Sequence, residues 1–356
     1  MYPQQIIDAL EHVRYPGNGK NLIDSGMLED DLRISGMEVS FSIIFDKDND
    51  PFRKSVVKAA ETAIHTYVDK NASVHIHMKY RKQNTPMKSD EIPALQAKNA
   101  LAIHSGKGGV GKSTVAANLA ITLAKKGYSV GLLDADIHGP SVPKMFKTEG
   151  CRPVSTPVNG RNLIEPIEQY GVKMLSIGFF VDPQQAVVWR GGMASNAIKQ
   201  LILDANWGKL DYLLIDLPPG TSDIHLSLVQ HLQLTGAIVI TTPQEVALVD
   251  ARKGVDMFMN EKINIPVLGL IENMAWFTPA ELPENKYFIF GKDGGKKLAE
   301  ELGIKLLGQI PLVQSIREGG DNGIPIALQD GHPAALMFEK IAEELKEKKK
   351  EENGTT

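Results

Sequence analysis

The sequence predicts an α/β protein with a doubly wound, mainly parallel sheet, preceded by a small α+β domain. From about residue 98 onward, short apolar runs alternate with stretches of helical spacing, which is typical of parallel sheets with crossover helices. A glycine-rich loop follows the first of these runs and precedes a helical stretch. The residues before position 83 carry a separate, shorter pattern of helices and strands.

Composition and charge limit the classes of function. The 356 residues are 42% hydrophobic and 23% charged, as in ordinary globular proteins, and the length suggests more than one domain. The net charge of −4 gives no broad basic field that would attract nucleic acid or anionic lipid. No apolar stretch approaches the ~20 residues that span a bilayer, and no secretory signal is recognised at the N-terminus. We therefore expect a cytoplasmic protein with neither nucleic acid nor membrane as a partner.

Residues 1–82 are expected to form the small α+β domain. The patterned stretches are Ile6–Val13 and Phe52–Val68 for helices, and Met37–Phe45 and Val74–Met78 for strands. His75 and His77 share one face of the last strand, as a pair of metal ligands would. Because no third ligand is in view, we interpret this face as polar and half exposed.

The remaining boundaries follow from composition. Residues 83–97 are polar and contain two prolines, which predicts a linker of roughly fifteen residues that lets the small domain move. Residues 98–346 form the predicted nucleotide-binding domain, and its last helix spans Ala334–Lys346. Residues 347–356 are rich in Lys and Glu and are expected to be a charged, disordered tail.

The glycine loop fits the pattern G-x-x-x-x-G-K-[ST] from Gly106 to Ser113, between an apolar strand and a helix. Its backbone N–H groups would hold phosphate oxygens, assisted by the positive end of the helix. Lys112 would reach the β- and γ-phosphates, and the Ser113 hydroxyl would ligate Mg²⁺. The expected nucleotide-binding residues of the loop are Gly106, Lys107, Gly108, Gly109, Val110, Gly111, Lys112, Ser113 and Thr114.

Lys107 is a second lysine that a plain phosphate loop does not require. The run K-G-G-x-G-K-[ST] resembles the deviant Walker A motif of the partition, septum-site and nitrogenase-iron-protein class of ATPases. This resemblance implies that Lys107 reaches across a dimer interface to the partner's nucleotide. A solvated lysine at the loop edge is the alternative.

Carboxylates follow two further predicted strands. Asp134 and Asp136 come at the end of Val130–Asp134, where one carboxylate could support the Mg²⁺ shell and the other could orient the attacking water. Asp216 ends the strand Tyr212–Asp216, as a Walker B carboxylate would, and Gly220 lies just beyond, where its N–H could meet a γ-phosphate. Turn or capping roles are the alternatives for each. The other predicted strands are Leu101–His104, Lys173–Ile177, Ala237–Thr241 and Val267–Glu272.

Five segments together resemble the Mrp/ApbC family of ATPases, which bind and pass on iron–sulfur clusters. They are Leu133–Pro143, Val188–Met193, Leu210–Asp223, Thr241–Arg252 and Gly269–Met274, and Gly192 stands where the family usually has proline. The resemblance assigns Asp136 to the water, Asp134 to the metal side, and Asn273 to the adenine base. For Asn273, a turn residue is the equal alternative. Residues 1–82 resemble the small domain that often precedes such ATPases.

The usual cluster ligands of that family are absent. The family has a C-x-x-C pair shortly after the adenine strand, so that a dimer offers four thiolates to one [4Fe–4S] cluster. Here Asn273–Pro283 contains no cysteine. Cys151, the single cysteine, lies far away in sequence, and we interpret it as a small buried or incidental side chain.

We therefore expect a homodimeric, Mg²⁺-dependent ATPase that converts ATP slowly to ADP and phosphate, with Lys107, Lys112 and Asp136 as its catalytic residues. Asp216 and Asp134 would support the Mg²⁺ that Ser113 ligates. The resemblance implies a role in iron–sulfur cluster assembly or carriage, with client or scaffold proteins as partners. The alternatives are a partition or septum-site positioning ATPase, and a cluster-free, nucleotide-gated scaffold for a client protein.

Overall fold

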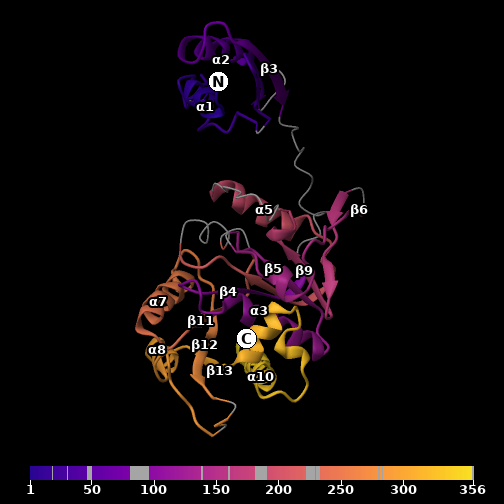
Figure 1. Cartoon of the computed structure of the whole chain (residues 1–356), viewed down its shortest axis with the longest axis vertical. Coiled ribbons are helices and arrows are strands. Elements are labelled where there is room, and N and C mark those ends of the chain that lie inside the picture. The colour runs from indigo at the N-terminus through magenta and orange to yellow at the C-terminus, as the bar shows by residue number, and fades with distance from the viewer. Residues whose placement is uncertain are drawn as a thin grey trace. The chain divides into compact units, whose positions relative to one another are not determined.

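In the computed structural model the chain divides into two compact units, Met1–Glu91 and Ile92–Thr356, each with its own sheet and core (Figure 1). The structure describes residues 1–17, 19–29, 31–45, 50–80, 96–137, 139–158, 161–180, 191–221, 229, 233–279, 281–282 and 284–354. The predicted linker lies outside the described residues up to residue 95. Its last residue, Ala97, already begins the first strand of the second unit.

The first unit is a three-stranded sheet with two helices on one face. Its elements are α1 (Pro3–Glu11), β1 (Arg33–Ser35), β2 (Glu38–Phe45), α2 (Arg53–Tyr67) and β3 (Ser73–Tyr80). β1 runs antiparallel to β2, and β3 runs parallel to β2. Val39, Phe41 and Ile43 alternate along β2 and are fully buried in the core, as their spacing predicts. His75 and His77 are exposed on β3.

The second unit is built on an eight-stranded sheet in the order β13-β12-β11-β4-β10-β5-β9-β8. The strands are β4 (Ala97–His104), β5 (Val130–Asp134), β8 (Ile167–Gln169), β9 (Val172–Ser176), β10 (Leu210–Asp216), β11 (Gly236–Thr241), β12 (Val267–Phe277) and β13 (Leu306–Leu312). All neighbours pair in parallel except β8, which is antiparallel to β9. The predicted doubly wound, mainly parallel sheet is confirmed.

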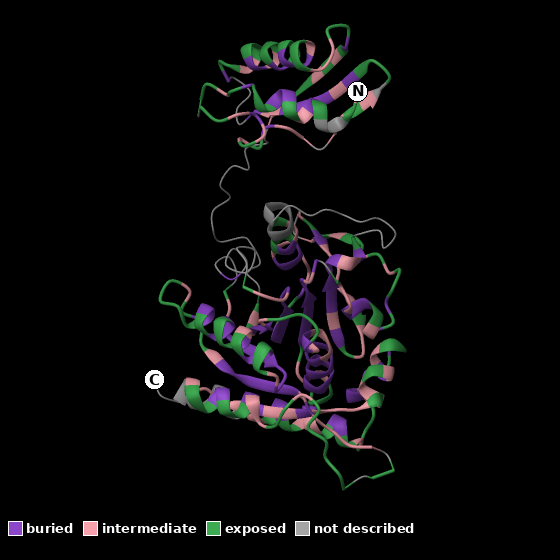
Figure 2. Ribbon diagram, turned by 60° about the vertical axis from the view of Figure 1, so that its left-hand side comes forward, coloured by how far each residue is buried: buried purple, intermediate pink, exposed green. Residues whose placement is uncertain are grey.

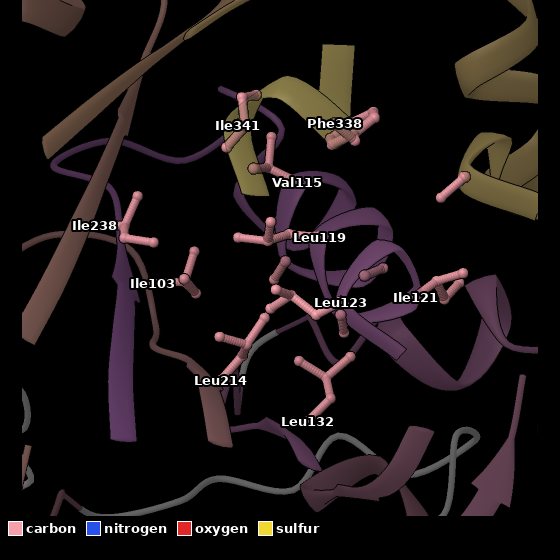
Figure 3. Packing of buried hydrophobic residues seen from close by; sticks show 14 of the residues in the cluster. Ile103, Val115, Leu119, Ile121, Leu123, Leu132, Leu214, Ile238, Phe338 and Ile341 are labelled. Carbon is pink, nitrogen blue, oxygen red and sulfur yellow. The ribbon is translucent and has the colours of Figure 1, made fainter. Parts of the chain in front are cut away.

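Helices cover both faces of this sheet. They are α3 (Lys112–Lys125), α4 (Val142–Met145), α5 (Gly191–Leu203), α7 (Glu245–Met259), α8 (Gly294–Leu302), α9 (Gln314–Asp321) and α10 (Pro333–Gly354), with 3₁₀ turns η1 (Ile177–Phe179) and η2 (Ile326–Leu328). On one face α3 and α10 pack against the central strands, and Leu119 of α3 lies beside Ile103 of β4 (Figure 3). On the other face lie α5, α7 and α8. The central strands are buried on both faces (Figure 2), as expected for parallel strands between two helical layers.

Five features differ from the sequence expectations. The sequence did not indicate the hairpin formed by β6 (Ser155–Val158) and β7 (Arg161–Ile164), nor the edge strand β8, because these strands are short and carry little apolar pattern. It also did not indicate β13, which contains a glycine and a proline that weaken a strand signal. β12 continues to Phe277 instead of ending near Glu272. α10 continues to Gly354, through residues expected to be a disordered tail, because Lys and Glu are good helix formers.

Candidate functional site

The glycine loop joins the carboxyl end of β4 to the start of α3, between the neighbouring strands β11 and β10. Gly109 and Gly111 have φ angles of 82° and 84°, in the left-handed region that glycine adopts without strain. Gly111 is also the N-cap of α3, so the loop ends at the positively polarised terminus of that helix. This arrangement is the one that holds phosphate groups.

Two glycines of the loop are needed for close packing. A Cβ atom on Gly106 would lie 2.1 Å from the carbonyl oxygen of Asp250, in α7. A Cβ atom on Gly111 would lie 2.3 Å from the side-chain nitrogen of Asn273, in β12. Gly106 would meet backbone, which cannot move aside, so only glycine fits there; at Gly111 the left-handed φ disfavours any other residue in addition to the contact with Asn273. The loop is therefore held between α7 and β12.

The ammonium group of Lys112 lies between two carboxylates. Its Nζ is 2.5 Å from Oδ1 of Asp216 and 3.8 Å from Oδ2 of Asp136, and it also donates to the Ser113 hydroxyl at 3.3 Å. The side chain of Lys112 is 6% exposed and that of Asp216 is completely buried. Burial raises the pKa of Asp216, while the nearby Lys112 opposes this change.

Asp134 is also completely buried, one strand away from Asp216 in the sheet. Its carboxylate accepts hydrogen bonds from the Ser176 hydroxyl at 2.9 Å and from the backbone N–H groups of Asp136 and Val142 at 3.2 and 3.3 Å. Burial, and then repulsion by Asp216, raise the pKa of Asp134 to about 7. Two acidic groups and one lysine are thus enclosed together.

This cluster fits a Mg²⁺ ion. Oδ2 of Asp216 is buried and makes no hydrogen bond to the described residues, which is a costly arrangement unless a cation or its water approaches. Oxygen ligands are those that Mg²⁺ prefers, and it usually keeps several waters. Ser113, Asp216 and Asp134 are therefore suitable to hold the ion and its hydration shell.

A cavity of about 420 Å³ lies beside the phosphate loop. It is lined by Gly111, Thr114, Ser141, Lys144, Met145, Asn273, Met274, Pro311, Leu312, Val313, Ile316, Arg317, Gly320 and Asp321. Asn273 is buried within β12, not at its tip, and its side-chain nitrogen donates to the Val110 carbonyl at 2.8 Å. This bond leaves the side-chain oxygen of Asn273 as the atom that can accept from a ligand.

Lys107 and Gly220, two predicted nucleotide-binding residues, lie apart from the buried cluster of Lys112, Asp134 and Asp216. Lys107 is exposed at the outer part of the loop, with no described carboxylate within ion-pair distance. Gly220 has a φ of 94°, and its N–H donates to the Ser105 carbonyl at 2.9 Å. A γ-phosphate would have to replace this bond before Gly220 could contact it.

Parts of the predicted motifs fall outside the described residues, namely His138, Val188, Trp189, Arg190, Ser222 and Asp223. In the segment after Asn273, β12 continues to Phe277, which forms an isolated antiparallel bridge with Tyr287. Cys151 is half buried and packs on the core around α3 and α10.

Sequence reasoning missed two buried polar side chains near the site. Ser176 ends β9 and holds Asp134. Glu272, next to Asn273, is completely buried; its carboxylate accepts from the N–H of Gly295 at the start of α8 and from the Gln309 side chain in β13. A search for polar residues at the ends of predicted strands would have found both, since ligands bind at that edge of a parallel sheet.

Two negative observations concern the described residues alone. Within them, no group of three or more His, Cys, Asp or Glu side chains could hold a metal ion through protein ligands only. Among the described helices, none is long and apolar enough to cross a bilayer.

The parallel sheet, the glycine loop on α3 and the buried lysine between two carboxylates together define a P-loop nucleotide-binding protein. Comparisons with known proteins agree. Residues 96–346 match the family model described as NUBPL iron-transfer P-loop NTPase, and residues 3–76 match the model described as iron–sulfur cluster assembly protein.

Individual relatives extend the match. The iron–sulfur cluster carrier protein of Synechocystis sp. is 41% identical over 345 residues, which covers 96% of this chain and 96% of that protein. The iron–sulfur cluster transfer protein NUBPL of Mus musculus is 45% identical over 256 residues, covering 71% and 78% respectively. Among solved structures, the nucleotide-binding protein of Archaeoglobus fulgidus in complex with ADP is 34% identical with a TM-score of 0.58, covering 68% of this chain and 92% of that one.

This chain therefore belongs to the family of iron–sulfur cluster carrier P-loop NTPases. The predicted resemblance to that family, including the small N-terminal domain, is confirmed. The cell division ATPase MinD of Pyrococcus furiosus, 24% identical with a TM-score of 0.51, shares the fold.

Proposed function

We propose that this chain is a Mg²⁺-dependent ATPase whose nucleotide cycle acts in iron–sulfur cluster assembly or transfer. The observation that carries the proposal is the position of Lys112. It lies at the start of α3, under the glycine loop, with Asp216 and Asp136 on either side of its ammonium group. A buried cation at this place serves phosphate binding, and the two carboxylates serve the metal and the water.

Each residue then has a role in hydrolysis. The loop amides and Lys112 bind the phosphates, so Lys112 would exchange its contact with Asp216 for phosphate oxygens. Asp136 is 13% exposed and borders the same ammonium group, where it can orient a water molecule. Ser113, Asp216 and Asp134 hold the Mg²⁺, which when bound neutralises charge on the β- and γ-phosphates.

The side-chain amide of Asn273 should select adenine over guanine. Because its nitrogen is fixed by the Val110 carbonyl, its oxygen can accept from the exocyclic amino group of adenine. Guanine presents a carbonyl oxygen at that position, which would repel the amide oxygen. ATP should therefore be preferred to GTP.

A homodimer is part of the proposal. Lys107 is exposed on the loop, where it can reach a nucleotide held by a second copy. Hydrolysis should be slow and serve as a switch, because the sequence shows no acceptor site for a small molecule. A rate typical of metabolic kinases would contradict this.

The cluster itself is treated as cargo. This chain supplies one cysteine, and its half-buried position on the core does not suit a shared ligand. Two modes therefore remain under the same proposal: a cluster held jointly with a partner protein, or a nucleotide-gated scaffold that acts on a client without holding a cluster. The fold likeness to septum-site ATPases gives no support for a positioning role.

Two measurements test the proposal. Phosphate release from Mg·ATP should be detectable in the wild type and should fall at least tenfold in Lys112→Ala and Asp136→Ala. Lys98→Ala, which changes an exposed lysine near the amino end of β4, should retain most activity. Equal, near-zero rates in all four proteins would favour a scaffold without hydrolysis.

The second measurement is anaerobic reconstitution with iron and sulfide, with bound iron and acid-labile sulfide counted per dimer. Wild type and Cys151→Ala are compared. A near-stoichiometric cluster that is lost in the variant would make Cys151 a ligand after all. No cluster in either, with ATP binding intact, would mean that this chain alone does not hold a cluster, and both remaining modes would then depend on a client or partner protein.

A further inference from the structure

Met274 has a backbone conformation that is unusual for its residue type. Its φ is 56°, in the left-handed region that residues with long side chains rarely adopt. It lies inside β12, directly after Asn273. At this point the pairing with β13 is irregular: Asn273 lies opposite Ile310 and Phe277 lies opposite Leu312. The residues from Met274 to Trp276 therefore bulge out of the regular ladder.

The bulge changes the direction of the Met274 side chain. In a regular strand, successive side chains point to opposite faces. Glu272 bonds to the start of α8 on one face, and Asn273 bonds to the phosphate loop on the other. Regular alternation would return Met274 to the α8 side. Instead Met274 lines the cavity beside the phosphate loop, together with Asn273.

Met274 supplies an apolar wall of that cavity. Its terminal methyl carbon lies 3.8 Å from where a Cβ on Gly111 would be, so the side chain reaches the phosphate loop. Pro311, Val313 and Ile316 continue the apolar lining. Asn273 offers a hydrogen-bond acceptor to the edge of a base, but nothing in that contact holds the face of the ring. A flexible thioether side chain suits a flat, polarisable ring.

We propose that Met274 packs against the face of the adenine base and that its left-handed backbone is the feature that brings it there. The inference rests on the proposed function, since it assumes that the cavity receives the base of ATP. Met274 is thus a binding residue that adds affinity for the base and none for the phosphates.

The test separates base from phosphates. Binding of Mg·ATP and of Mg·tripolyphosphate, which lacks the base, is measured by calorimetry for wild type, Met274→Ala, Met274→Gly and Met274→Leu. The matched control is Met259→Ala, because Met259 is an exposed methionine at the end of α7. Loss of one apolar contact with the ring should weaken ATP binding about tenfold in the Ala and Gly variants. Tripolyphosphate binding should stay unchanged, and Met274→Leu should restore most of the ATP affinity.

The thermal midpoint tests the backbone part of the argument. Glycine adopts φ near 56° without strain whereas alanine does not, so Met274→Gly should melt at a higher temperature than Met274→Ala. The opposite order would overturn the claim of a strained backbone.

Three binding outcomes would overturn the role of Met274. If the Ala variant binds ATP like the wild type, the base does not touch Met274. If the Ala variant loses as much affinity for tripolyphosphate as for ATP, Met274 acts through the phosphate loop. If the wild type binds ATP no more tightly than it binds tripolyphosphate, the cavity does not receive the base. A wild type that binds neither compound would remove the proposed ATPase function itself, and this inference with it.

Discussion

The buried carboxylate of Asp134 should make the protein less stable at pH 7 and above than at pH 4, and replacing it by asparagine should reverse this. The pKa of Asp134 is raised to about 7 from the ordinary value of 3.8, chiefly by burial. A raised native pKa means that the folded state prefers the protonated form. Stability is therefore unaffected below about pH 4 and is lost progressively as the pH rises from there to about 7.

The magnitude follows from a pKa difference of about 3. At about 1.4 kcal/mol per pKa unit, ionisation of Asp134 costs roughly 4 kcal/mol of folding free energy at pH 8 and less than half of that at pH 5. Asparagine removes this cost but has one acceptor oxygen instead of two. In Asp134 one oxygen accepts from the N–H of Asp136, and the other accepts from both the Ser176 hydroxyl and the Val142 N–H. If the asparagine oxygen takes the second place, only the bond from Asp136 is lost, worth about 1 kcal/mol.

Asp134→Asn should therefore be more stable than the wild type by about 3 kcal/mol at pH 8 and by less than about 1 kcal/mol at pH 5. For a unit of this size, the gain at pH 8 corresponds to a rise of roughly 6–12 °C in melting temperature. The assay is thermal unfolding in EDTA at both pH values, followed by circular dichroism. Glu343→Gln, in an exposed pair with Lys126, is the control and should show no such gain. An equal difference at both pH values, or a less stable variant at pH 8, would refute the reasoning.

Three further predictions concern the phosphate loop and its supports. Gly254→Ala, in α7, should lower the melting temperature, because the new Cβ would lie 2.6 Å from the buried His104 ring. Alanine otherwise favours helices, so the exposed control Lys253→Ala should show no such loss. Asn273→Asp should weaken ATP binding about tenfold by calorimetry, since a carboxylate would face the Val110 carbonyl; unchanged affinity would contradict its assignment. Lys107→Ala should reduce ATP hydrolysis while ATP binding remains, and equal phosphate release would remove its role across a dimer.

The parts of the site that lie within one motif were predictable from the sequence. Gly109, Gly111 and Lys112 are fixed by a local pattern, because the loop's conformation depends on glycine at set positions followed by a helix. Asp134 and Asp216 were predictable from strand ends, since parallel strands bring their carboxyl ends to the same edge of the sheet. The structure places both beside each other in neighbouring strands.

The parts that depend on contacts between distant segments were not predictable. Glu272 is held by Gly295 and Gln309, and no spacing within β12 reveals those partners. The left-handed backbone of Met274 depends on the pairing of β12 with β13, which the sequence leaves open. The length of β12 was also underestimated, since a strand that bulges loses the alternation by which strands are recognised.

If the chain acts in cluster transfer as proposed, its lack of a C-x-x-C pair sets a requirement on the partner protein. A [4Fe–4S] cluster bound in the usual way needs four ligands, commonly thiolates. A dimer of this chain has two copies of Cys151, each half buried on the core around α3 and α10. Even if both took part, a partner would have to supply at least two more ligands. If neither does, the partner holds the whole cluster and this chain contributes the nucleotide cycle alone. Thiol labelling of Cys151 during transfer separates the two cases: protection requires the shared site, and undiminished labelling assigns all ligands to the partner.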